Sequence, residues 1–97
     1  MTSQLLSLST EAPFQYLPLT AALRRFVQVH GERDGAVVVS GQHTTTAVII
    51  NELEERLLMD LKRWLSQMAP PGDGWKHDDL HLRPGIPDDE PRNAHAH

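Results

Sequence analysis

The sequence contains no cysteine, which excludes disulfides and thiolate zinc sites. Any metal chemistry would therefore have to use histidine, carboxylate or water ligands. The chain also lacks an apolar run of the roughly 18 residues that a membrane-spanning helix needs. Its first residues, MTSQLLSLST, lack the basic start and long apolar centre of a signal peptide. Together these absences predict a cytoplasmic protein with no membrane partner.

Basic residues are also few, with nine Lys and Arg against 13 Asp and Glu and a formal net charge of −4. Proteins that bind nucleic acid usually carry a basic face, so we expect no nucleic-acid partner. Walker, GxGxxG, GxSxG and HExxH motifs are absent, which disfavours several common enzyme classes. A chain of 97 residues forms at most one domain, and such a domain has a modest core that buries roughly 60–65% of its unfolded surface.

Two amphipathic helices are predicted. The first is capped by Thr20, ends at Gly31 and places Leu23, Phe26, Val27 and His30 along one face. The second begins at Asn51, which forms a capping-box-like pattern with Glu54, and ends at Pro70-Pro71. The apolar residues of this second helix recur at helical spacing: Leu53, Leu57, Leu58, Leu61, Leu65 and Met68.

Three segments are predicted to be β-strands. Residues 4–8 are expected to form an edge strand, and the β-branched runs 36–40 and 44–50 are expected to be buried strands separated by Gly41. Two helices packed on a mixed β-sheet give an α+β fold. This sheet is narrow for two helices, so either another subunit supplies strands or the chain is the front part of a longer domain. Beyond Pro71 the sequence predicts loops that carry histidines.

Two short polar segments are candidates for a site. His43 lies beside three threonines, which either hold its ring so that one nitrogen faces a ligand, or simply satisfy it in a polar strand connection. Asn51 and Glu52 lie where a strand is expected to give way to a helix. This junction is either a plain helix cap or a place where the helix N-terminus holds an anion while Glu52 faces the pocket.

The C-terminal region carries further side chains that can bind a ligand or a metal. His77, Asp78, Asp79 and His81 match no standard zinc pattern, and a solvated loop is the simpler interpretation. His95 and His97 would share a face if the chain end were extended, although chain ends commonly fray.

The run GQHTTTAVIINELEERLLMDLKRWL, followed by APPGDGWKHDDLHLR and DDEPRNAHAH, closely resembles the YjbQ/UPF0047 family, also described as secondary thiamine-phosphate synthase enzymes. The similarity extends from about Gln4 to His97. The resemblance implies a compact α+β fold with a mixed sheet, usually assembled as a homotrimer, when the fold is complete, with sites near subunit interfaces. Family members continue beyond the NAHAH stretch with further strands, so we expect residues 1–97 to form a single YjbQ-like domain whose C-terminal strands are missing.

The resemblance also implies which residues act. The expected catalytic residues are His43, Glu52, His77 and Asp78; the expected substrate-binding residues are Thr44, Asn51 and Asn93; and the expected metal ligands are His43, His77 and His97. His97 is favoured over His95, which falls at a variable position of the family. The resemblance is compatible with a divalent cation as cofactor, either zinc or magnesium, but it does not identify which one.

The expected function is secondary thiamine-phosphate synthase activity on small phosphorylated thiamine precursors. The alternative is a non-catalytic module that binds a small molecule or a metal, or an inactive truncated paralogue. Because the later strands are missing, the sequence leaves open whether this chain is itself an enzyme.

Overall fold

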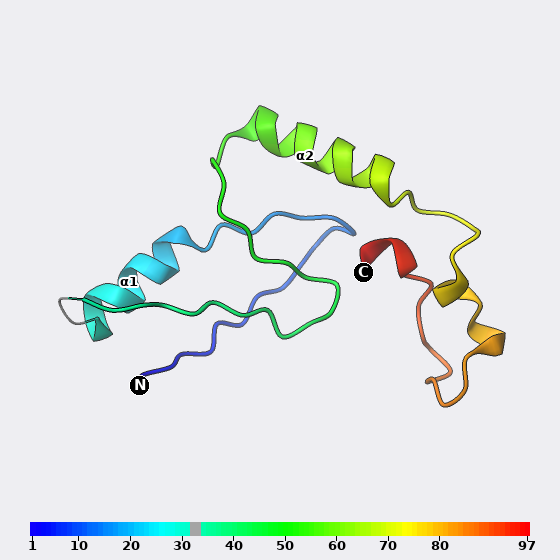
Figure 1. Ribbon diagram of the computed structural model, residues 1–97, viewed down its shortest axis with the longest axis horizontal. Coiled ribbons are helices and arrows are strands. Elements are labelled where there is room, and N and C mark those ends of the chain that lie inside the picture. Colours follow the sequence, from blue (N-terminus) through cyan, green and yellow to red (C-terminus); the bar gives the residue numbers. More distant parts are fainter. Residues whose placement is uncertain (32–33) are drawn as a thin grey trace. The chain divides into compact units, whose positions relative to one another are not determined.

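A computed structural model describes residues 1–31 and 34–97, and the described chain consists of helices joined by long irregular segments (Figure 1). Two α-helices are present, α1 at Thr20–His30 and α2 at Glu55–Met68. Three short 3₁₀-helices follow: η1 at Lys76–Asp78, η2 at Leu80–Leu82 and η3 at Ala94–Ala96. The chain groups into two compact units, Met1–Val38 and Val39–His97. In the two described ranges no helix has the length and apolar character needed to cross a membrane.

The predicted α+β fold with a mixed sheet is wrong, because no β-strand occurs in the described residues. The three segments expected to be strands, 4–8, 36–40 and 44–50, form no ladder. Outside the helices, the backbone–backbone hydrogen bonds recorded for the described residues all join residues three or four apart, as in turns and helix ends. A β-branched sequence favours extended backbone, but it forms a strand only when a neighbouring segment supplies hydrogen bonds.

Helix α1, in the first unit, confirms the first predicted helix and corrects its start. Thr20 is the first helical residue rather than the cap, and Leu19 at the cap position makes no side-chain cap hydrogen bond. The helix ends as predicted at Gly31, whose N–H donates to the Val27 carbonyl at 2.7 Å. The rings of Phe26 and His30 lie 5.1 Å apart, as expected for residues four apart on one helix face.

Helix α2, in the second unit, confirms the second predicted helix but begins later than Asn51. Glu54 is the cap, since its two carboxylate oxygens accept hydrogen bonds from the N–H groups of Arg56 and Leu57 at 3.0 and 2.7 Å. These bonds lower the pKa of the Glu54 carboxyl below its ordinary value of 4.5. The helix stops at Met68, just before the two prolines, as predicted.

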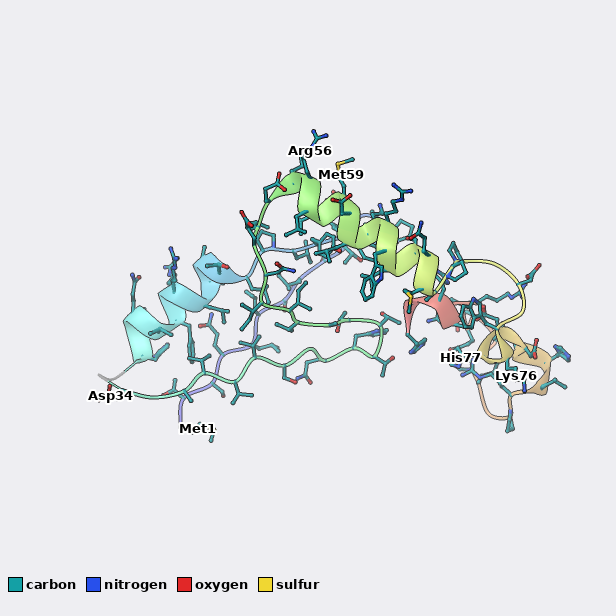
Figure 2. The ribbon with its side chains drawn as sticks, turned by 45° about the horizontal axis from the view of Figure 1, so that its top comes forward. Met1, Asp34, Arg56, Met59, Lys76 and His77 are labelled. Atoms are coloured by element: carbon teal, nitrogen blue, oxygen red, sulfur yellow. The ribbon has the colours of Figure 1, made fainter. Side chains whose placement is uncertain are left out.

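The predicted core is not formed by the described residues, in which no hydrophobic side chain is fully buried. On the apolar face of α2, Leu57, Leu58 and Leu61 are half-buried, whereas Met59 and Arg56 project into solvent (Figure 2). The run 48–50, expected to fill the core, is exposed, and Ile50 is fully so. Of the other residues predicted for this face, Leu65 and Met68 are exposed and Leu53 lies before the helix, so the predicted stripe is formed only in part and has no buried partner surface.

Candidate functional site

The second unit brings two of the predicted histidines into contact near the chain end. The rings of His77 and His97 lie 4.7 Å apart between centroids in an edge-to-face arrangement. His77 belongs to η1, drawn in gold in Figure 1 and labelled in Figure 2, and His97 follows η3, drawn in red. A contact between these two short helices therefore joins the HDD and NAHAH segments of the sequence.

Asp78 holds η1 and η3 together. Its side chain is 6% exposed and is the one buried polar or charged residue in the described chain. Its Oδ1 accepts a hydrogen bond from the N–H of Ala94, the first residue of η3, at 3.0 Å. A helix leaves its first N–H groups without partners inside the helix, and the Asp78 carboxylate supplies one here. The carboxylate predicted to be catalytic is thus engaged in placing the segment that carries His97.

Arg83 connects His77 to the loop before η3. One guanidinium nitrogen, Nη1, donates to the main-chain carbonyl of His77 at 3.2 Å, and the same group pairs with Glu90 Oε1 at 3.5 Å. Both side chains are about one quarter exposed. Neither residue was predicted to belong to the site. A signal was present in the sequence, since opposite charges flank the Pro84-Gly85 turn, which can bring them together.

Two buried polar atoms in this region have no hydrogen-bond partner: Nε2 of His77 and Oδ1 of Asn93. Buried polar atoms are nearly always paired, so unpaired ones in a native fold require an explanation. Both belong to residues predicted for the site, one catalytic and one substrate-binding. They provide a ring nitrogen and an amide oxygen that a bound polar molecule can satisfy. We refer to His77, Asp78, Asn93 and His97 as the C-terminal cluster.

His43 is held within its own loop, Gly41 to Thr46, which we call the HTT loop. Its Nδ1 accepts a hydrogen bond from the Thr45 N–H at 3.2 Å and lies 2.8 Å from Thr45 Oγ1. Its carbonyl accepts from both the N–H and the hydroxyl of Thr46, at 3.1 and 2.6 Å. A Cβ at Gly41 would lie 2.7 Å from the Thr46 hydroxyl, so glycine leaves room for this turn. The ring is therefore positioned by the N–H and the hydroxyl of Thr45, a contact that both interpretations of the sequence allow.

Asn51 and Glu52 lie on irregular, exposed backbone before α2. The Asn51 Oδ1 accepts a hydrogen bond from the N–H of its neighbour Glu52 at 2.8 Å, whereas Glu54 caps the helix. The recorded contacts of the described residues join neither this pair nor His43 and Thr44 to the C-terminal cluster. The structure thus assembles four of the predicted site residues and leaves the other four in local arrangements.

The expected metal ligands do not form a complete centre. In the part of the chain that the structure describes, there is no group of three or more His, Asp or Glu side chains placed to hold a metal ion. His77 and His97 are close to each other, but the third expected ligand, His43, is engaged in the HTT loop. The described residues do not by themselves fit a metal ion.

The chain thus combines two amphipathic helices with a cluster of polar side chains that includes two neighbouring histidines. Its sequence has no standard nucleotide-binding or metalloprotease motif. The sequence profile described as UPF0047 protein YjbQ-like matches residues 4–97, and the chain belongs to this family.

Two curated relatives support the assignment. A UPF0047 protein of Archaeoglobus fulgidus is 40% identical over 75 residues, which cover 77% of this chain and 57% of the relative. A UPF0047 protein of Methanothermobacter thermautotrophicus is 31% identical over 87 residues, which cover 84% of this chain and 61% of the relative. The matched region thus spans about three fifths of these relatives. No solved structure matches the chain significantly.

Proposed function

We propose that this UPF0047 protein contributes to a secondary thiamine-phosphate synthase activity on small phosphorylated thiamine precursors in the cytoplasm. The observation that supports this most directly is the contact between His77 and His97, two residues from distant motifs whose rings lie 4.7 Å apart. Histidine is the side chain best suited to moving protons near neutral pH. This pair includes the unpaired Nε2 of His77, and Asn93 supplies a second unpaired polar atom, which favours proton transfer to a bound polar substrate.

In this proposal the residues have distinct roles. His77 exchanges a proton with substrate through Nε2, the buried ring nitrogen that has no other partner. Asn93 accepts a hydrogen bond from substrate through Oδ1, which is also buried and unpaired. Asp78 keeps η3 in place, so that His97 stays against His77. His43 and Glu52 as acid–base groups, and Thr44 and Asn51 as phosphate-binding residues, complete the proposed site.

The proposal assigns no binding site to a divalent cation. Zinc and magnesium are instead added in the assay to test whether either one supports the activity. The proposed assembly is a homotrimer, because large apolar side chains are exposed, among them Val38, Ile50 and Trp64. Exposed apolar surface of this kind commonly marks an association site.

The test is an assay of the purified protein for thiamine phosphate formation, with and without zinc or magnesium. We expect a His43→Ala/His77→Ala double variant to lose at least about 100-fold in rate, the range that acid–base groups typically contribute. His95→Ala, in the middle of η3, is the matched control and is expected to retain activity. Equal rates for the wild type and the double variant would rule out the proposed site. Binding of a phosphorylated precursor without turnover would instead favour a non-catalytic binding module.

A further inference from the structure

The hydrogen bonds of the HTT loop fix which nitrogen of His43 carries the proton. A main-chain N–H can only donate, and the Thr45 N–H points to His43 Nδ1 at 3.2 Å. Nδ1 must therefore offer a lone pair. The Thr45 hydroxyl, 2.8 Å from the same nitrogen, can donate to it as well. In a neutral imidazole the single proton then lies on Nε2.

We propose that His43 is held as the Nε2–H tautomer and meets its ligand as a hydrogen-bond donor, not as a metal ligand. A metal ion binds a ring nitrogen through its lone pair, and in this tautomer that lone pair is on Nδ1, where Thr45 already uses it. This agrees with the absence of a three-ligand group in the described residues. The identity of the ligand rests on the proposed function: a phosphoryl oxygen of the substrate is an acceptor that Nε2–H suits.

The arrangement is local. Every contact that positions His43 comes from Thr45 or Thr46, within three residues along the chain. Both the N–H and the hydroxyl of Thr46 hold the His43 carbonyl, which fixes the backbone from which the ring projects. His43 itself is exposed, whereas Thr45 is half-buried. The tautomer is thus set by the loop and presented toward solvent.

Long-range ¹H–¹⁵N NMR spectra of the full chain, labelled with ¹⁵N-histidine, test the tautomer directly. At a pH where the ring is neutral, His43 is expected to show the cross-peak pattern of the Nε2–H form. The Nδ1–H pattern, or the mixture seen for free imidazole, would overturn the proposal. His81, which is exposed and on η2, provides an internal reference for a histidine outside the HTT loop.

Two matched variants separate the hydroxyl of Thr45 from that of its neighbour. Thr45→Val removes the shorter of the two contacts to Nδ1 and is expected to shift His43 toward the free-imidazole mixture. Thr44→Val removes a hydroxyl outside this hydrogen-bond set and is expected to leave the pattern unchanged. Identical spectra for the two variants would contradict the assigned role of Thr45. Neither side chain is fully buried, so both variants are suitable for the comparison.

Two additions test the consequence. Equimolar zinc chloride is expected to leave the His43 Nε2–H signal in place, and loss of that signal through replacement of the proton by zinc would overturn the proposal. Inorganic phosphate tests the proposed function separately. A His43 that shows the Nε2–H pattern but does not respond to phosphate would count against the phosphorylated substrate, while the tautomer would stand.

Discussion

At the scale of single residues, Asp78 is the clearest case of a side chain whose environment defines its role. It is buried, and its carboxylate accepts the Ala94 N–H. Asp78 Oδ1 therefore places η3, and with it His97, while the catalytic role of Asp78 stays a prediction.

Replacing Asp78 with alanine is expected to free η3 and to separate the rings of His77 and His97. A hydrogen bond to a charged group contributes about 1.5–3 kcal/mol, so the Ala94 amide should exchange with solvent roughly 10-fold faster or more. Hydrogen exchange measured by NMR, together with the nuclear Overhauser effect between the two rings, provides the readout. Asp79→Ala, at the next position and half-buried, is the control. Unchanged Ala94 exchange in Asp78→Ala would refute the positioning role.

At the scale of elements, the N-cap of α2 lies at Glu54 and not at Asn51, where the sequence predicted it. Glu54→Ala is expected to expose the N–H groups of Arg56 and Leu57, because the Glu54 carboxylate accepts from both. Asn51→Ala is expected to leave them protected, since Asn51 bonds only its neighbour Glu52 in the contacts described. Amide exchange at Arg56 and Leu57 measures the difference. Greater loss of protection in Asn51→Ala would restore the capping box predicted from the sequence.

The same cap makes the first turn of α2 sensitive to acid. The folded pKa of Glu54 lies below its ordinary value of 4.5, chiefly because the Arg56 and Leu57 N–H groups favour the charged carboxylate. Its contribution is therefore complete above pH 4.5 and is lost as the pH falls through the lowered pKa. Titration of the Arg56 and Leu57 amide signals should show this loss, and Glu54→Gln should remove it. A first turn that loosens instead as the pH rises would contradict the assignment.

Both helices were predictable because helix signals are local. Leu57, Leu58 and Leu61 lie on one face through the 3.6-residue period alone, and the two prolines stop α2 wherever the rest of the chain lies. A strand is different, because the run 44–50 needs a partner segment that its own sequence cannot specify. The β-branched pattern was interpreted as a sheet, whereas in the described chain that run forms no ladder and is exposed except at Thr45.

The site was predictable to a similar extent. The hydrogen bonds of the HTT loop join residues at most three positions apart. The sequence could therefore predict that threonine hydroxyls would bond to His43. The grouping of Asp78 with Ala94 joins residues 16 positions apart in a loop region, and spacing alone does not predict such a contact. Family resemblance pointed to His77 and His97, but it carried no information on Arg83, whose contact with the His77 carbonyl depends on the turn between them.

At the scale of the whole molecule, the described chain lacks the feature that normally makes unfolding cooperative. No hydrophobic side chain in residues 1–31 and 34–97 is fully buried, and Val38, Ile50 and Trp64 are exposed. Burial of apolar surface provides most of the free energy of folding. A single chain of this kind should therefore have a small free energy of unfolding and should not unfold cooperatively. The proposed homotrimer would bury part of this surface between subunits.

Association of this kind makes thermal stability depend on protein concentration, because the assembled state is favoured by mass action. Sedimentation should give the mass of three chains, and calorimetry a transition temperature that rises with concentration. A heat-capacity change near the roughly 1.2–1.5 kcal/mol/K of an ordinary 100-residue domain is expected only for the assembled form. Trp64→Ser, on the exposed surface of α2, is expected to lower the mass found by sedimentation toward that of one chain. Arg63→Ser, at the neighbouring position, is the control and is expected to leave the mass unchanged. A single-chain mass with a sharp, concentration-independent transition would show that the chain folds alone and that the homotrimer proposal is wrong.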